Sequence, residues 1–298
     1  MGGNSRSFAK VAVLGPGLLG GSIAKAVHTR LSGCELRLWA RRPEPLALAR
    51  SLGITAHTYL DLCEAVRGAD LVILATPIGV FPQLVQGMLP ALAPGAIVTD
   101  VGSVKGMVHD TAGAALTRAG HIFIGSHPMA GAEKQGLEHA REDLLLGATV
   151  AITNPHHAPA AQVERLAAFW RALGGCTCEM TPALHDCAVA RISHMPHILA
   201  ALCARNAGGE RMDYLRLLAS SGFRDTTRVS SGGVSMWADI LQENSVSICQ
   251  LIDACIADMQ SLAELLRTRN KPALADWLEH AKETREDILA GEIHPQGD

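Results

Sequence analysis

A histidine that follows a short apolar run is the first candidate for chemistry in this chain. His127 lies in Gly125-Ser126-His127-Pro128-Met129-Ala130-Gly131, directly after the strand-like residues 121–124. Glycine, proline and small residues break a strand, so the stretch is expected to leave the strand as a loop. In open α/β sheets ligands bind beyond the carboxyl ends of the strands, and histidine exchanges protons near neutral pH. The pattern therefore predicts that His127 handles a proton in a crevice.

A glycine-rich turn near the start of the chain indicates a dinucleotide cofactor. Gly15-Pro16-Gly17-Leu18-Leu19-Gly20 follows the apolar run 10–14 and precedes a helical stretch, 22–30. In this context the first glycine allows a tight turn and the second lets the backbone approach a pyrophosphate. The third lets the helix pack closely on the strand. An ordinary glycine-rich turn is the alternative.

The tip of the next strand favours NADP over NAD. Residues 35–39 form the predicted strand, and Arg41 and Arg42 follow it at the place where an NAD site normally offers an acidic residue to the ribose. Two guanidinium groups there suit a 2′-phosphate. NAD stays open, because a solvated basic turn would look the same.

Two more predicted strands, 69–75 and 96–100, end in residues suited to a ligand. Thr76 and Pro77 follow the first strand on the cofactor side, and Ser103 and Lys105 follow the second. A lysine in such a place is, taken alone, typical of the surface.

A pair of histidines lies on the long helix expected over 182–206. Ser193, His194 and His197 belong to Ile192-Ser193-His194-Met195-Pro196-His197, and the i, i+3 spacing places the two rings on about the same face. Three interpretations compete: a metal pair, which lacks a carboxylate partner; two core histidines; or the wall of a polar substrate pocket. We expect no metal.

Two arginines four residues apart are candidates for binding an anion. Arg224 and Arg228 lie in Gly222-Phe223-Arg224-Asp225-Thr226-Thr227-Arg228, within the Ser/Gly-rich connection 221–233. A guanidinium held there suits bidentate capture of a carboxylate. Two solvated surface charges are the alternative.

The order of elements predicts an α/β N-terminal Rossmann-type doubly wound sheet followed by an all-α C-terminal domain. Strands and helices alternate up to Met180, and no convincing strand follows. We expect a dinucleotide-binding domain over 1–180 and a helical domain for substrate binding and dimerisation over 181–298. The wide apolar stripe over 245–267 predicts a homodimer through the helical domain.

Composition excludes several classes of protein. The 298 residues are 48% apolar and 18% charged, with net charge −3, so a large core is expected and nucleic acid is a poor partner. Eight scattered cysteines form no zinc or disulfide pattern. No signal peptide and no run of about 18 apolar residues is visible, which predicts a cytoplasmic protein without a membrane partner.

Six segments, read together, resemble one known family. They are GPGLLGGS, LATPIG, TDVGSVKG, GSHPMAGAEKQG, ISHMPH and GFRDTTRVSSGGVSMWADI, in this order from about Lys10 to Asn244. Together they are similar to the prephenate/arogenate dehydrogenase family of tyrosine biosynthesis, in its short form without a regulatory domain or a fused chorismate mutase. The HPMAG and SHxPH segments are the most specific part of the match.

The resemblance implies an NAD(P)-dependent oxidative decarboxylation. Prephenate would give 4-hydroxyphenylpyruvate and arogenate would give tyrosine, with hydride passing from the hydroxyl-bearing ring carbon to a nicotinamide. Carbon dioxide would leave from the opposite ring carbon as the ring becomes aromatic. The sequence does not decide between the two substrates.

The resemblance also implies roles for the candidate residues. His127 would bind the ring hydroxyl and accept its proton, and Ser103 would hold the reacting groups in register. Arg228, helped by Arg224, would bind a substrate carboxylate, and Glu133 would gate entry. The side-chain end of the pocket would be lined by Ser193, His194 and His197. The cofactor would contact Gly15, Gly17, Leu18, Leu19, Gly20, Arg41, Arg42, Thr76 and Pro77.

Two other functions fit parts of the sequence. A reductase of the β-hydroxyacid dehydrogenase type shares the two-domain pattern, but such enzymes usually carry a catalytic lysine on the long helix, and residues 182–206 contain none. A nucleotide-sensing Rossmann protein without catalysis would not need His127, Ser103 and Arg228 together.

Arg224 stands where some members of the family have a lysine. An arginine there keeps the charge but changes the geometry of its hydrogen bonds.

Overall fold

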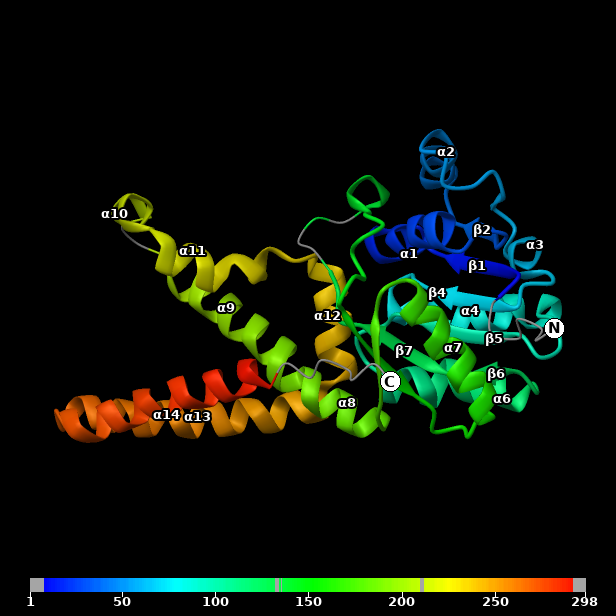
Figure 1. Cartoon of the computed structure of the whole chain (residues 1–298). Coiled ribbons are helices and arrows are strands. Elements are labelled where there is room, and N and C mark those ends of the chain that lie inside the picture. The colour runs from blue at the N-terminus through cyan, green and yellow to red at the C-terminus, as the bar shows by residue number, and fades with distance from the viewer. Residues whose placement is uncertain (1–7, 132–133, 135, 210–211, 292–298) are drawn as a thin grey trace. The chain divides into compact units, whose positions relative to one another are not determined.

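Six short parallel strands form the main sheet of the computed structural model, which describes residues 8–131, 134, 136–209 and 212–291. The strand order is β3-β2-β1-β4-β5-β6, which is that of a Rossmann fold and confirms the predicted class (Figure 1). The strands are β1 Lys10–Leu14, β2 Glu35–Trp39, β3 Thr58–Tyr59, β4 Leu71–Leu74, β5 Ile97–Asp100 and β6 Ile122–Phe123.

The main sheet is buried on both faces. Successive residues of a strand point to opposite faces, so Val11 and Val13 of β1 join one apolar cluster while Ala12 and Leu14 join the other. The helices that connect the strands cover these faces. They are α1 Leu18–Arg30, α2 Pro43–Ser51, α3 Leu62–Val66, α4 Phe81–Met88, α5 Gly106–Val108 and α6 Ala114–Arg118, with a π-helical stretch at His109–Gly113 between the last two.

The last three strands form a separate sheet, which corrects the expectation of a single one. In the order β7-β8-β9, β7 Gly125–Pro128 pairs antiparallel with β8 Thr149–Thr153, and β8 pairs parallel with β9 Cys176–Glu179. His127 therefore lies in a strand, opposite Ala151, and not in a loop. The sequence around His127 could not show this, because its pairing partners come more than 20 residues later. Helix α7 Ala160–Ala172 connects β8 to β9.

The chain after β9 is helical in all its described elements. Residues 182–206 run as one rod in Figure 1: α8 Pro182–Val189, a π-helical turn at Ala190–His194, and α9 Met195–Asn206. The stretch 221–233, expected to be a connection with a loop or a short helix at 222–228, is mostly helical, and its helix α11 Ser221–Thr227 lies against α9. The remaining helices here are α10 Met212–Leu218, α11 Ser221–Thr227, a 3₁₀ turn at Arg228–Ser231 and α12 Val234–Glu243.

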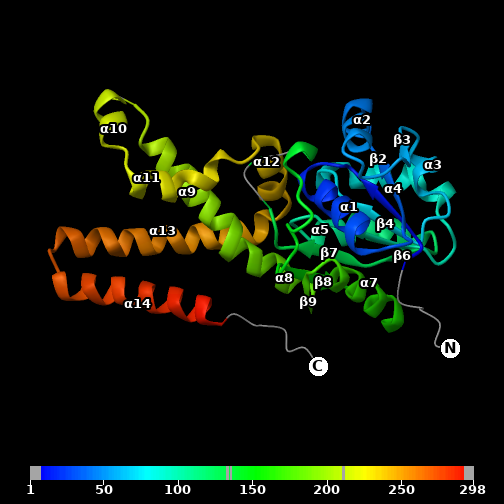
Figure 2. The ribbon, with the colours of Figure 1, turned by 45° about the horizontal axis from the view of Figure 1, so that its top comes forward.

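Contacts divide the chain into two compact units, 1–244 and 245–298. The second unit contains α13 Ser245–Arg267 and α14 Lys271–Ala290, which lie side by side as a hairpin (Figure 2). By length and composition alone, 182–206 and 245–267 could each cross a membrane. A core helix of a soluble protein passes the same test, and the first stretch carries buried histidines, so this is weak support for a membrane span.

Candidate active site

A cavity of about 920 Å³ lies along the carboxyl ends of β1, β2 and β4. Of the predicted cofactor residues, it is lined by Gly15, Gly17, Arg41, Arg42, Thr76 and Pro77. Leu18, Leu19 and Gly20 are not in its lining. Leu19 packs against the core, and Gly20 is buried where a Cβ would collide with Gly15 and Ala75. Gly20 thus allows close packing of α1 on the sheet.

The glycine turn fits the pyrophosphate of a dinucleotide. Gly15 has φ +101°, a conformation that favours glycine, and it starts the tight turn. A Cβ added at Gly17 would meet no atom within 4 Å, so the cavity is open at this point. Gly17 also precedes the 13-residue helix α1, and no side chain caps its N-terminal N–H groups. These donors and the helix dipole suit a diphosphate.

A second cavity, of about 290 Å³, contains the predicted base. Ser103 follows β5 and His127 comes from β7, so two sheets meet at this cavity. The π-helical turn at Ala190–His194 and helix α12 also border it. The full lining is Ser103, His127, Met129, Ala130, Gly131, Ser193, His194, Met236, Trp237 and Ile240.

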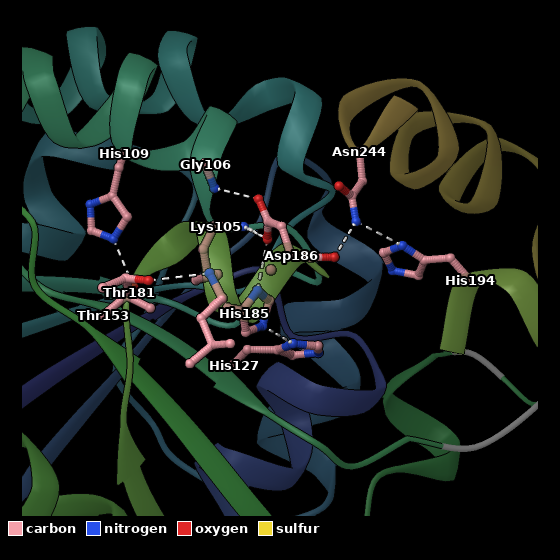
Figure 3. Close-up of polar contacts among 12 residues, drawn as sticks. Lys105, Gly106, His109, His127, Thr153, Thr181, His185, Asp186, His194 and Asn244 are labelled. Atoms are coloured by element: carbon pink, nitrogen blue, oxygen red, sulfur yellow. Dashed lines mark hydrogen bonds and ion pairs between the residues drawn. The ribbon is translucent and has the colours of Figure 1, made fainter. Parts of the chain in front are cut away.

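His127 is the first member of a chain of hydrogen bonds that leads away from the cavity. Its Nδ1 lies 2.9 Å from Nε2 of His185, and Nδ1 of His185 lies 2.7 Å from Oδ1 of Asp186 (Figure 3). The Asp186 carboxylate also accepts the backbone N–H groups of Lys105, at 2.7 Å, and Gly106, at 2.8 Å. The three side chains therefore form an ordered Asp–His–His arrangement.

Lys105 is fully buried, which corrects the expectation of a surface lysine. Its ammonium pairs with Asp100, at the end of β5, and donates to the carbonyl oxygen of Ser126 at 2.8 Å. The same Asp100 accepts the N–H groups of Gly102 and Ser126. This pair therefore joins the end of β5 to the residue before His127. It connects the two sheets at the site.

The surroundings of His127 keep its ring neutral. Burial is the largest cause, and the positive charge of Lys105 and the nearby rings of His185 and His194 act in the same direction. Together they lower the pKa of His127 well below 6.5. A neutral imidazole has one free lone pair and can accept a proton at neutral pH.

His194 and His197 have different places, although they lie one turn apart. His194 lines the cavity and meets the side-chain nitrogen of Asn244 at 3.2 Å; burial lowers its pKa to about 4. His197 is outside the lining, contrary to expectation, because it stacks on Trp237 at a centroid distance of 3.6 Å. Trp237 is part of the cavity lining, and His197 stacks on its indole ring from outside the lining.

Comparisons with known proteins identify the family. The model of the prephenate dehydrogenase nucleotide-binding domain matches residues 23–179, and that of the prephenate dehydrogenase dimerization domain matches 181–280. The chain belongs to the prephenate dehydrogenase family.

Individual members of the family are similar over almost their whole length. A cyclohexadienyl dehydrogenase of Zymomonas mobilis is 32% identical, over 95% of this chain and 96% of that protein. A prephenate dehydrogenase structure from A. aeolicus, in complex with hydroxyphenyl propionate and NAD+, has a TM-score of 0.82 at 28% identity and covers 95% of this chain and 99% of its own. The Synechocystis arogenate dehydrogenase structure has a TM-score of 0.78 at 31% identity, and the match covers 94% of this chain and 99% of its own.

The two arginines predicted to bind a carboxylate lie outside the cavity lining of this family member. Arg224 on α11 and Arg228 on the following 3₁₀ turn are both exposed in the single chain. The residue after Arg228, Val229, makes a backbone hydrogen bond with the ring of His197. The Arg228 segment is thus attached to the back of the cavity wall. Glu133, the predicted gate, lies outside the described residues.

Sequence reasoning missed His185, Asp186, Trp237 and Asn244. The adjacent pair His185-Asp186 was a visible signal on the predicted long helix, but no spacing rule connects it with His127, 58 positions earlier. Trp237 and Asn244 carry no signal of their own in one sequence. Their roles depend on how α12 and the residue after it pack against the rod 182–206, which only the tertiary structure shows.

Proposed function

We propose that this chain catalyses the oxidative decarboxylation of prephenate, arogenate or both, with hydride transfer to a nicotinamide cofactor. Family membership and the names of its relatives support the reaction. The observation in the structure that carries the proposal is His127, whose ring contacts His185 through Nδ1 and lines a cavity together with Ser103. This cavity adjoins the end of β5, and the cofactor cavity adjoins β4, its hydrogen-bonded neighbour.

The reaction needs one base and a cavity that holds the substrate in a defined orientation towards the cofactor. A bound nicotinamide supplies the hydride acceptor. His127 takes the hydroxyl proton as hydride leaves the same ring carbon. The bond to the ring carboxylate then breaks, carbon dioxide departs, and the electron pair enters the ring, which becomes a phenolate. His127 returns its proton to that oxygen. Aromatisation drives the reaction, so the protein mainly orients the reactants and moves one proton.

Other cavity residues suit the rest of the substrate. Ser103, beside His127, can donate to the ring hydroxyl or hold it in register. His194 and Ser193 present polar atoms from the π-helical turn, and Trp237 offers a flat apolar face to the ring. Burying the ring between these groups also keeps water from the reacting carbon.

A two-by-two assay tests the function. Prephenate and arogenate are each mixed with NAD or NADP, and the reduced cofactor is followed by its absorbance. We expect reduction that depends on one of the two substrates and releases carbon dioxide. The absence of reduction in all four mixtures, with a folded protein, would reject the proposal.

We further propose that NADP is the preferred cofactor. Arg41 and Arg42 both line the cofactor cavity after β2, where the adenosine ribose of a Rossmann cofactor lies. Glu44 and Glu138 line the same cavity, and a carboxylate close to the ribose would favour NAD. The two adjacent guanidinium groups at the strand tip decide our preference, since they fit a phosphate in bidentate fashion.

Replacing Arg41 and Arg42 together by alanine should raise the KM for NADP by about tenfold or more, the loss of one charged hydrogen bond. The KM for NAD should stay within about threefold, because no 2′-phosphate is involved. Steady-state kinetics with both cofactors measures the effect. Arg118→Ala, an exposed arginine on α6, is the control. Equal changes for the two cofactors would contradict the preference.

Replacing Arg228 by alanine should raise the KM for the substrate by about tenfold, because a carboxylate would lose a charged partner. The turnover number should change little, since Arg228 is not among the residues that line the cavity of His127. Arg171→Ala is the control, because it removes an exposed arginine from α7, an element of the N-terminal part of the chain. An unchanged KM in the Arg228 variant would show that Arg228 is a surface charge only.

A homodimer through the helical domain completes the proposal. The matching family model is described as a dimerization domain, and α10 exposes Tyr214, Leu217 and Leu218 at 67%, 80% and 74%. Large exposed apolar side chains in succession are typical of an interface. The mass in solution, measured by light scattering, tests the dimer; a monomer at micromolar concentration would reject it.

A further inference from the structure

We propose that Asp186 and His185 are positioning residues that hold His127 in the tautomer with its proton on Nδ1, so that Nε2 faces the substrate as the proton acceptor. The three side chains and the hydrogen bonds between them are drawn in Figure 3. The kinetic part of this inference rests on the proposed function, whereas the tautomer is a property of the protein alone.

The direction of the hydrogen bonds starts at Asp186. An ionised carboxylate only accepts hydrogen bonds, and this one has three N–H partners: Lys105 and Gly106 of the backbone and Nδ1 of His185. Burial alone would raise the pKa of Asp186, but the hydrogen bonds from His185, Lys105 and Gly106 outweigh it and lower the pKa. His185 Nδ1 must therefore carry a proton.

The position of the proton on His185 determines the position of the proton on His127. A neutral imidazole carries one proton, so a ring protonated on Nδ1 has its lone pair on Nε2. The lone pair of His185 faces Nδ1 of His127 at 2.9 Å, and a hydrogen bond there requires the proton to be on His127 Nδ1. His127 Nε2 then carries a lone pair, and no hydrogen bond among the described residues occupies it.

This arrangement also stabilises the proton once it is transferred. When Nε2 accepts the hydroxyl proton, His127 becomes an imidazolium whose charge is shared through His185 towards Asp186. The nearby ammonium of Lys105 is already paired with Asp100, so it opposes the charged ring only in part. A histidine held in the other tautomer would present an N–H group to the hydroxyl and could not act as a base.

His194, in the same cavity, is held in the opposite tautomer. The Asn244 side-chain nitrogen donates to the carbonyl oxygen of Asp186 at 2.8 Å, which fixes the orientation of the amide. The same nitrogen lies 3.2 Å from Nδ1 of His194, so Nδ1 accepts and Nε2 carries the proton. The cavity therefore has one acceptor ring and one donor ring, and His194 serves as an internal reference.

Nitrogen-15 NMR of the full-length protein labelled at histidine reads both tautomers without substrate. The experiment is run at pH 8, where histidine in water carries one ring proton. Signals are assigned by their loss in His127→Asn and His194→Asn. We expect the proton on Nδ1 of His127 and on Nε2 of His194. A proton on Nε2 of His127 would overturn the inference, whether or not the protein turns over prephenate.

Two substitutions of His185 provide the kinetic test. In His185→Leu, nothing accepts the proton of His127 Nδ1, and we expect turnover to fall by about 100-fold or more, by analogy with other oriented histidine bases. In His185→Gln, the amide oxygen can replace the acceptor nitrogen and should restore at least about tenfold of this loss. The KM should stay within about threefold for both, because His185 does not line the cavity.

His109→Leu is the matched control, since His109 is equally buried and bonded to Thr153 at 2.7 Å but does not touch His127. Its turnover should stay within about threefold of the wild-type value. Equal losses in the Leu and Gln variants of His185, or no loss in either, would overturn the positioning role. If His185→Leu does not fold, the tautomer of the wild-type protein and the Gln variant still decide.

Discussion

Replacing His127 with asparagine should lower the turnover number by at least about 100-fold while the KM for substrate changes little. Asparagine can keep a polar atom near the position of Nδ1 and so the contact with His185. It has no group at the position of Nε2, and the hydroxyl proton loses its acceptor. Steady-state kinetics with the better substrate of the two-by-two assay measures the change.

The pH profile of the wild-type enzyme gives a second reading of the same residue. Because the pKa of His127 is held well below 6.5, chiefly by burial, its neutral form persists as the pH falls through 6.5. Activity that depends on this base should be lost only at lower pH. His57→Asn, an exposed histidine, should leave both readings unchanged. Near-normal turnover in His127→Asn would reject the assignment of the base.

Replacing Lys105 with methionine should destabilise the protein by about 3–5 kcal/mol. The substitution keeps most of the side-chain volume, but it leaves Asp100 charged, fully buried and without its ammonium partner. It also removes the donor to Ser126 and so loosens the connection between the two sheets. Denaturant unfolding followed by circular dichroism measures the loss.

The control for this experiment is an ion pair of the same kind at the surface. Lys282 and Glu279 on α14 are about 60% exposed, and such pairs contribute at most about 1 kcal/mol. Lys282→Met should therefore stay within about 0.5 kcal/mol of the wild type. If the two methionine variants have the same unfolding midpoint, the buried pair does not hold the sheets together.

Local sequence patterns were sufficient for five of the six strands of the main sheet. The apolar runs at 10–14, 71–74 and 97–100 are strands because they are buried on both faces. The spacing of the glycines at 15–20 was enough to predict the tight turn between β1 and α1. The Rossmann class and the family followed from these patterns and from the motifs. Strand β3, only two residues long, has too little sequence to be detected.

Features that depend on distant partners could not be predicted. Lys105 looks like a surface residue until Asp100 and Ser126 surround it, and His127 looks like a loop residue until β8 pairs with its strand. Helical periodicity placed His194 and His197 on one face, but it could not show that Trp237 would come between His197 and the cavity. In each case one deciding contact joins distant parts of the sequence: Lys105 with Ser126, His127 with β8, and His197 with Trp237.

The π-helical turn at Ala190–His194 sets the rotation between two parts of the rod. In an unbroken α-helix, nine residues at about 100° each would place His194 half a turn from His185, on the opposite side. A π turn holds one more residue and removes about 100° of that rotation, leaving the two rings about 80° apart. The ring that orients His127 and the ring that lines the cavity can then both face the site from one straight segment. In this enzyme, one additional residue in a helical turn brings two histidines to the site without a bend in the helix.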